Sequence, residues 1–292
     1  MDDKTKPILD ERAPLKDRMT VYIGVLVVLL TSWVYIVGMG WHMGTLPFSG
    51  EMTMDMPMNE SMKMDSIDTT KDSSLLTSIL TWMPPMSNVW QAQDFFLLFL
   101  MWSVMMTAMM TPSILPMLML FTTLSIRQKQ QGQASASTLV LLAGYLTSWI
   151  LFSLVITFPQ YLMHLSGMLN PMMEPTHAYL GSMMLVIAGI YQFTPLKDAC
   201  LTVCQSPLSF MMNNWKDGNL GAFIIGYKHG FFCVGCCWAL MLTLFALGVM
   251  NIMWVIILTV VVLLEKLSYK NPLLFRRVTG TLLIFWGIAI TV

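Results

Sequence analysis

The sequence from Gly221 to Val249 reads GAFIIGYKHGFFCVGCCWALMLTLFALGV and contains neither Asp nor Glu. An apolar run of about 20 residues or more is long enough to cross the hydrocarbon core of a bilayer as a helix. The apolar residues here are continuous, whereas strands of a membrane barrel alternate apolar and polar residues. This stretch therefore predicts a membrane-spanning helix.

The composition of the whole chain points the same way. Of its 292 residues, 56% are hydrophobic and 11% are charged, whereas about 25% are charged in ordinary soluble domains. A water-soluble protein of this size needs more charged residues to cover its surface, so we expect a lipid bilayer to surround the chain. The 16 basic residues balance 16 acidic ones. Without a basic excess, nucleic acid is not an expected partner.

Seven apolar runs predict an all-α fold, a polytopic transmembrane helical bundle of about seven spans. Besides Gly221–Val249, the predicted spans are Thr20–Met39, Asp94–Leu124, Thr138–Leu162, Ala178–Phe193, Ile252–Leu264 and Val278–Val292. Residues 1–19 are expected to form a cytoplasmic tail and residues 20–39 the first transmembrane helix. Residues 40–93 would then form an extracytoplasmic Met-rich loop, and residues 94–292 a six-span bundle with a Cys/His face.

The orientation is predicted from the basic residues, because cytoplasmic connections of membrane proteins are enriched in Lys and Arg. The opposite connections contain only Lys63 and Lys71. The first tail and the connections after spans two, four and six contain the others, among them Lys16, Arg18, Arg127, Lys129, Lys197, Lys216, Arg276 and Arg277. We therefore expect the N-terminus inside, the C-terminus outside, and a multi-pass protein of the plasma membrane.

Methionine is unusually frequent, with 30 residues in the chain. Within the spans we interpret methionine as flexible core filler. A polar loop has no core to fill, yet residues 40–93 contain the regular series Met52, Met54, Met56, Met58, Met62 and Met64. Neutral, soft thioether sulfur selects Cu(I) among biological metals. We expect this series to capture copper, and the alternative is an inert Met-rich linker.

Three of the four histidines fall on the predicted outer side. His42 stands beside Met43, His164 follows Met163, and His177 follows a pair of methionines by a few residues. Imidazole binds copper and zinc. These residues are candidate metal ligands, although a histidine at a membrane interface also serves as an amphipathic anchor.

The five cysteines form another group. Cys200 and Cys204 are spaced by one helical turn, and His229, Cys233, Cys236 and Cys237 fall on one face of a helix. Polar, metal-binding groups at membrane depth are functional candidates. On a reducing inner side, thiolate ligands are expected rather than a disulfide. The alternative is that the cysteines are small buried hydrophobic residues.

Several classes of protein are disfavoured. No phosphate-binding loop indicates an ATP-driven pump, and no paired carboxylates indicate a hydrolase. Asp94, Glu265 and Lys266 are expected near span boundaries rather than at membrane depth, where a proton-driven pump needs ionisable groups.

The cysteine-rich stretch resembles a known family. Its residues are His229-Gly230-x-x-Cys233-x-Gly235-Cys236-Cys237-Trp238-Ala239-Leu240-Met241, preceded by Gln192-x-x-Pro195-Leu196-Lys197 and Cys200-x-x-x-Cys204. This pattern is similar to a family of predicted metal-binding integral membrane proteins of unknown function from bacteria and archaea. The resemblance covers spans two to seven and implies a membrane location and metal binding. It implies no reaction, and it does not extend to the Met-rich loop.

Together these features predict a copper-handling membrane protein that captures, transports or delivers Cu(I) to an extracytoplasmic copper enzyme. A membrane copper enzyme or a copper chaperone is the expected partner, and transport or delivery is favoured over catalysis. One alternative is an accessory subunit of a membrane copper enzyme. Another is a thiol or copper oxidoreductase with Cys233 and Cys236 as its redox pair. Zinc at the Cys/His face would instead be a structural ion.

Overall fold

The computed structural model describes residues 15–42, 90–131, 136–170, 173–249, 251–267 and 272–291. Within these residues all regular elements are helices, which confirms the all-α prediction. They are α2 (Leu15–His42), α4 (Ala92–Gln130), α5 (Thr138–Leu165), α6 (Ala178–Tyr191), α7 (Pro195–Gln205), α8 (Pro207–Asn214), α9 (Gly218–Leu247), α10 (Ile252–Leu267) and α11 (Pro272–Ala289).

Each predicted span coincides with a helix, but not every helix is long and apolar enough to cross a membrane. Five are, namely α2, α4, α5, α9 and α11, and the bent pair α6–α7 would be a sixth. Helix α10 has 16 residues, or about 24 Å at 1.5 Å per residue, which is less than the roughly 30 Å of a bilayer core. The apolar helices are compatible with a membrane protein, and a count of seven spans stays a prediction.

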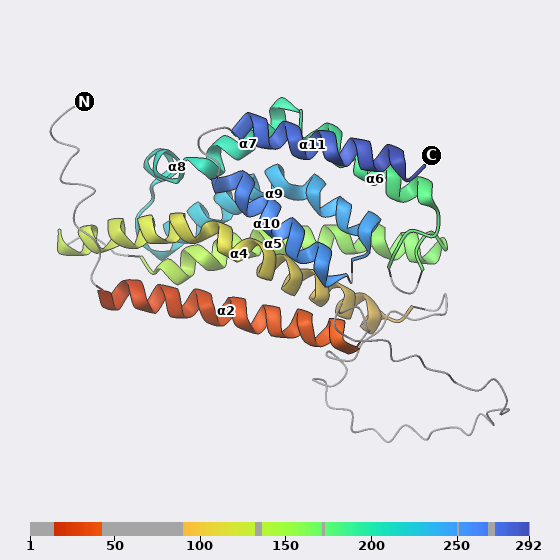
Figure 1. Ribbon diagram of the computed structural model, residues 1–292. Helices are drawn as coiled ribbons and strands as arrows, with labels where there is room; N and C mark the ends of the chain where they lie inside the picture. Colours follow the sequence, from red (N-terminus) through yellow and green to blue (C-terminus); the bar gives the residue numbers. More distant parts are fainter. Residues whose placement is uncertain are drawn as a thin grey trace, which may run out of the picture.

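Helices α5, α9 and α11 run in one direction and α4 and α10 in the other, with α9 in the middle of the bundle (Figure 1). Helix α9 packs most extensively against α5 and also against α6 and α7. Helix α2 lies beside α4 on one flank, and α11 lies beside α6 on the other. The helix that contains the cysteine-rich stretch is therefore enclosed by its neighbours.

Two glycines allow α5 and α9 to approach closely. A side chain at Gly226 of α9 would overlap the backbone carbonyl of Leu141, and one at Gly144 of α5 would overlap the carbonyl of Phe223. Small residues permit such contact between helices that pack in a membrane. This close packing brings Tyr145 of α5 against α9, and the tyrosine is fully buried.

A sharp bend separates α6 from α7. The two helices are bent by 66° relative to each other. The Thr194 side chain accepts a hydrogen bond from the Lys197 backbone N–H, and Pro195 begins α7 at a position where its missing N–H costs nothing. The bend lays α7 across α9, so that residues of both helices share the interior.

The basic residues at helix ends gather at one end of the bundle. At this end α4 and α10 finish while α9 and α11 begin (Figure 1). The basic residues here are Arg127 and Lys129 of α4, Lys216 before α9, and Arg276 and Arg277 of α11. We call this the basic end. The predicted grouping of basic connections agrees with this arrangement, and the orientation in a membrane stays a prediction.

Candidate metal centre

Three cysteines from two helices converge in the interior. The Sγ atoms of Cys204 on α7 and of Cys233 and Cys236 on α9 all lie within 4.8 Å of one another. The Sγ atoms of Cys204 and Cys236 are 3.9 Å apart. All of the cysteines are free thiols, and Cys233 and Cys236 are buried. We call Cys204, Cys233 and Cys236 the cysteine cluster.

The cluster forms because local spacing and helix packing act together. Cys233 and Cys236 are three residues apart and therefore share a face of α9. Cys204 reaches them because α7 crosses this face. A side chain at Gly235 would come within 3.0 Å of the Cys200 Sγ, so this glycine leaves room for α7 to approach α9.

A buried lysine lies directly against the cluster. The Lys266 ammonium donates to the Cys233 Sγ at 2.8 Å and to the Ser113 hydroxyl at 2.9 Å. Only 7% of Lys266 is exposed. Buried charges need a partner of opposite charge, and among the described residues no carboxylate forms a salt bridge with Lys266. The Cys233 sulfur, as a thiolate, is the anionic partner that this arrangement provides.

A tyrosine completes the polar contacts of Cys233. The Tyr145 hydroxyl lies 3.0 Å from the Cys233 Sγ and 3.2 Å from the Ser113 Oγ, and it donates to the Met110 carbonyl. Ser113, Tyr145 and Lys266 come from α4, α5 and α10 respectively. The cluster is thus held by side chains from helices that lie far apart in the sequence.

An ion pair anchors α7 to α10 beside the cluster. The Lys197 Nζ lies 2.7 Å from a carboxylate oxygen of Glu265, and both side chains are buried. The Gln205 amide also donates to the Glu265 backbone carbonyl. Glu265 and Lys266 do lie near the end of a helix, as the sequence indicates, but their side chains point into the protein. Removing either partner of such a pair leaves an uncompensated buried charge, so the pair fixes the position of α7.

A small cavity adjoins the cluster. Its volume is about 20 Å³, and its lining includes Cys204, His229, Met117 and Lys266. His229 is 4% exposed, and its Nδ1 has no hydrogen-bond partner within the described residues. A thiol, an imidazole and a thioether therefore meet at a space large enough for about one water molecule.

The donor set fits a soft metal ion. Sulfur ligands at about 2.3 Å from a metal ion lie about 4 Å from one another, which is close to the spacing within the cluster. Thiolates select Cu(I) and zinc. Structural zinc takes four protein ligands, and an adjacent ammonium repels a divalent ion more than a monovalent one. The geometry is therefore compatible with Cu(I).

Comparison with known families agrees with this chemistry. A family model described as PpoB2, copper chaperone, matches residues 99–290. The chain belongs to this copper-chaperone family. The match includes all five cysteines and most of α4 to α11, and the family description points to copper handling. No curated protein and no solved structure matches the chain.

The motif-based prediction of a metal-related family is confirmed to the extent that the chain belongs to a copper-related family. Of the sequence-predicted ligands, the structure brings together Cys204, Cys233 and Cys236. The Cys237 Sγ lies 3.3 Å from that of Cys236, and His229 lines the adjoining cavity. Cys200 packs near Gly235 and does not join the cluster.

The outer candidates are placed differently. His164 is buried near the end of α5, with its ring 5.0 Å from that of Trp90, whereas His177 is exposed at the start of α6. Neither is joined to the cysteine cluster by a contact in the described residues. His42 is the last residue of α2. Met43 and the series Met52, Met54, Met56, Met58, Met62 and Met64 lie outside the described residues.

Sequence reasoning missed three members of the site, namely Ser113, Tyr145 and Lys266. Ser113 and Tyr145 are ordinary residues of apolar helices, and nothing in their spacing distinguishes them. Lys266 had a usable signal, since a lysine inside a membrane helix is a functional candidate. Ending the sixth predicted span at Leu264 placed this lysine outside, whereas α10 continues to Leu267.

Proposed function

We propose that this member of the copper-chaperone family holds Cu(I) at Cys204, Cys233 and Cys236 inside a membrane and delivers it to a copper enzyme on the extracytoplasmic side. The observation that supports this most directly is the convergence of three buried sulfur atoms within 4.8 Å. The family match independently favours copper as the cargo.

The surrounding residues have distinct roles in this proposal. Three thiolates and one Cu(I) have an excess of negative charge, which the Lys266 ammonium partly balances. Ser113 and Tyr145 hold Lys266 and the Cys233 sulfur in place. Burial keeps water and oxidants from the thiolates, so the cargo stays reduced. Cu(I) leaves by stepwise exchange of one sulfur ligand for another, which requires no change in its oxidation state.

The proposal includes a membrane orientation. The chain spans the membrane seven times, with α10 as the short span, and the basic end lies in the cytoplasm. Residues 40–93 are then extracytoplasmic, where their methionines would take part in passing Cu(I) to the partner enzyme. His42, Met43, His164 and His177 belong to the same outer side and are candidates for that transfer.

Copper titration tests the proposed site. The purified protein would be titrated with Cu(I) without oxygen, in competition with a chromogenic Cu(I) chelator. We expect the combined substitution of Cys204, Cys233 and Cys236 by Ser to abolish tight binding. The matched control Cys200→Ser removes a thiol outside the cluster and should retain it. Unchanged affinity and stoichiometry in the triple variant would exclude the cluster, and zinc as the main metal after isolation would argue for a structural ion.

Labelling of intact cells tests the orientation separately. A membrane-impermeant maleimide should label the Ser73→Cys variant, because residues 40–93 are proposed to lie outside. The Gln131→Cys variant, whose exposed position lies at the basic end, should be labelled only after the cells are opened. The opposite result would reverse the proposed orientation.

A further inference from the structure

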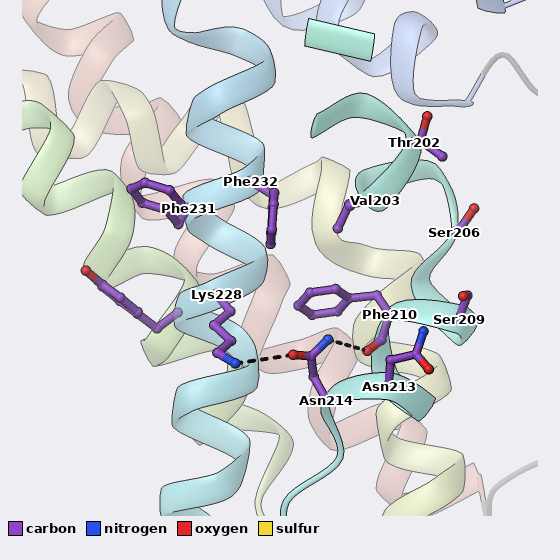
Figure 2. A pocket seen from close by; sticks show the side chains of 11 residues that line it. Thr202, Val203, Ser206, Ser209, Phe210, Asn213, Asn214, Lys228, Phe231 and Phe232 are labelled. Atoms are coloured by element: carbon purple, nitrogen blue, oxygen red, sulfur yellow. Dashed lines mark hydrogen bonds between the residues drawn. The ribbon is translucent and has the colours of Figure 1, made fainter. Parts of the chain in front are cut away.

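A large groove lies next to the cysteine cluster on the outside of the bundle. It has a volume of about 690 Å³ and runs between α7, α8 and α9. Figure 2 shows side chains from all three helices around it, including Val203 of α7, Phe210 of α8 and Phe232 of α9. This volume is typical of sites that bind small molecules.

The groove and the small cavity at the cluster share a wall. Val203 and Ser206 line the groove, whereas their neighbours Cys204 and Pro207 line the cavity. The other part of the wall is Phe210, which is 7% exposed and whose ring lies 5.3 Å from that of His229. In Figure 2 this ring points from α8 toward α9. Phe210, which lines the groove, therefore packs against a residue that lines the small cavity.

A positive charge lies in the groove. Lys228 is exposed, and its ammonium donates to the Asn214 side-chain oxygen at 3.3 Å. The Asn214 amide in turn donates to the Phe210 carbonyl, as Figure 2 shows. No carboxylate of the described residues forms a salt bridge with Lys228. The groove is thus suited to an anion, and its cation is linked through Asn214 to Phe210, which packs against His229.

We infer that this groove binds a small anionic thiolate complex of Cu(I), and that Cu(I) passes from it by Phe210 to Cys204 and His229. This inference rests on the proposed function and adds the source and direction of the cargo. In a reducing compartment, soft Cu(I) is bound by thiolates, and small thiol carriers with free carboxylates are anionic. Lys228 supplies the complementary charge.

The transfer is a ligand exchange. A bond forms between Cu(I) and the Cys204 sulfur while a bond to the carrier sulfur breaks. The proton of the Cys204 thiol passes to the departing carrier, which leaves as the free thiol. Copper stays Cu(I), and no electron is transferred. His229 can accept the ion during this exchange because its Nδ1 is unpartnered within the described residues. Since Lys228 lies in the half of α9 nearer the basic end (Figure 1), loading begins at the end that the proposed orientation places in the cytoplasm.

Loading kinetics test the inference. The full-length protein would be mixed with the Cu(I)–glutathione complex, and the rate of Cu(I) acquisition would be compared with the rate from the cationic Cu(I)–acetonitrile complex. We expect Lys228→Glu to slow loading from the glutathione complex about tenfold, because electrostatic attraction of this kind changes association rates by a factor of ten or more. Loading from the cationic complex should not slow.

The control Lys216→Glu makes the same charge change at the basic end, outside the groove lining, and should have little effect on the loading rate.

Phe210→Ala should speed both loading and removal of Cu(I) severalfold with unchanged equilibrium affinity, and Phe210→Trp should slow both. The inference would be overturned if Lys228→Glu and Lys216→Glu changed the loading rate equally. It would also be overturned if Lys228→Glu slowed loading from the glutathione complex and from the acetonitrile complex equally. The inference would also be overturned if a phospholipid were tightly bound in the groove and its exchange left the rate of Cu(I) loading unchanged. If neither the unsubstituted protein nor any of these variants bound Cu(I) tightly, that result would instead contradict the proposed function.

Discussion

The cysteine cluster in the interior and the candidate histidines near the end of the bundle opposite the basic end differ in how the structure holds them. The cysteine cluster draws on α7 and α9 and is bounded by side chains of α4, α5 and α10. Of the histidines, His164 is buried against Trp90 and His177 is exposed. Contacts between helices, together with the spacing of Cys233 and Cys236 on α9, bring the cysteines into one cluster.

The largest expected effect is on Cu(I) affinity, and it distinguishes the cysteine cluster from the candidate histidines. Cys236→Ser should lower the Cu(I) affinity of the purified protein by more than about 100-fold, since even residues that only orient metal ligands account for 10- to 100-fold. His164→Ala should leave this affinity unchanged. Competition with a Cu(I) chelator measures both. If the histidine variant lost as much affinity as the cysteine variant, the distinction between the cysteine cluster and the histidines would be wrong.

The next effect concerns the buried ion pair beside the cluster. Glu265→Gln leaves the Lys197 ammonium buried without a counter-charge and should lower the free energy of unfolding by about 3–5 kcal/mol. The comparison is Asp198→Asn, which removes an ion pair with Arg276 in which the aspartate side chain is 53% exposed and the arginine side chain 7% exposed. Because solvent reaches this pair from the aspartate side, that change should cost less than Glu265→Gln. Thermal unfolding in detergent compares the two, and equal losses would show that burial of the pair has no special importance.

Packing around α9 predicts a smaller loss of stability. Gly226→Ala places a methyl group against the Leu141 carbonyl of α5 and should cost about 1–3 kcal/mol, as overpacking usually does. Gly38→Ala on α2 provides the control, because a methyl group there meets no atom of the described residues within 4 Å. It should be neutral or slightly stabilising, since alanine favours helices more than glycine does. A tolerated Gly226→Ala would argue against the close contact of α5 and α9.

The smallest expected effect on binding comes from the lysine at the cluster. Lys266→Met removes the charge that balances the thiolates and should lower Cu(I) affinity about tenfold, in the range found for residues that support metal ligands. Lys216→Met, an exposed lysine at the same end, should not change the affinity. A rise in affinity for Lys266→Met would mean that the ammonium competes with the metal for Cys233 instead of supporting it.

Much of the helical architecture follows from local pattern. The predicted starts at Thr138, Ala178 and Ile252 coincide with the first residues of α5, α6 and α10, because apolar runs with clear polar or turn-forming flanks define helices by themselves. The ends were harder to predict. Helix α4 continues beyond Leu124 to Gln130, and α10 beyond Leu264 to Leu267, since polar residues extend a helix without any apolar signal. The helices α7 and α8 were not among the predicted spans for the same reason.

The sequence alone determined that this is an all-α chain rich in apolar helices, and that Cys233 and Cys236 share a helix face, because both depend on residues close together in the chain. Only the tertiary structure decided that Cys204 completes a cluster with them while Cys200 does not, and that Ser113, Tyr145 and Lys266 surround it. These choices depend on the bend before α7 and on the glycine contacts of α9. Such contacts join residues separated by tens of positions in the chain, and periodicity along one helix contains no information about them.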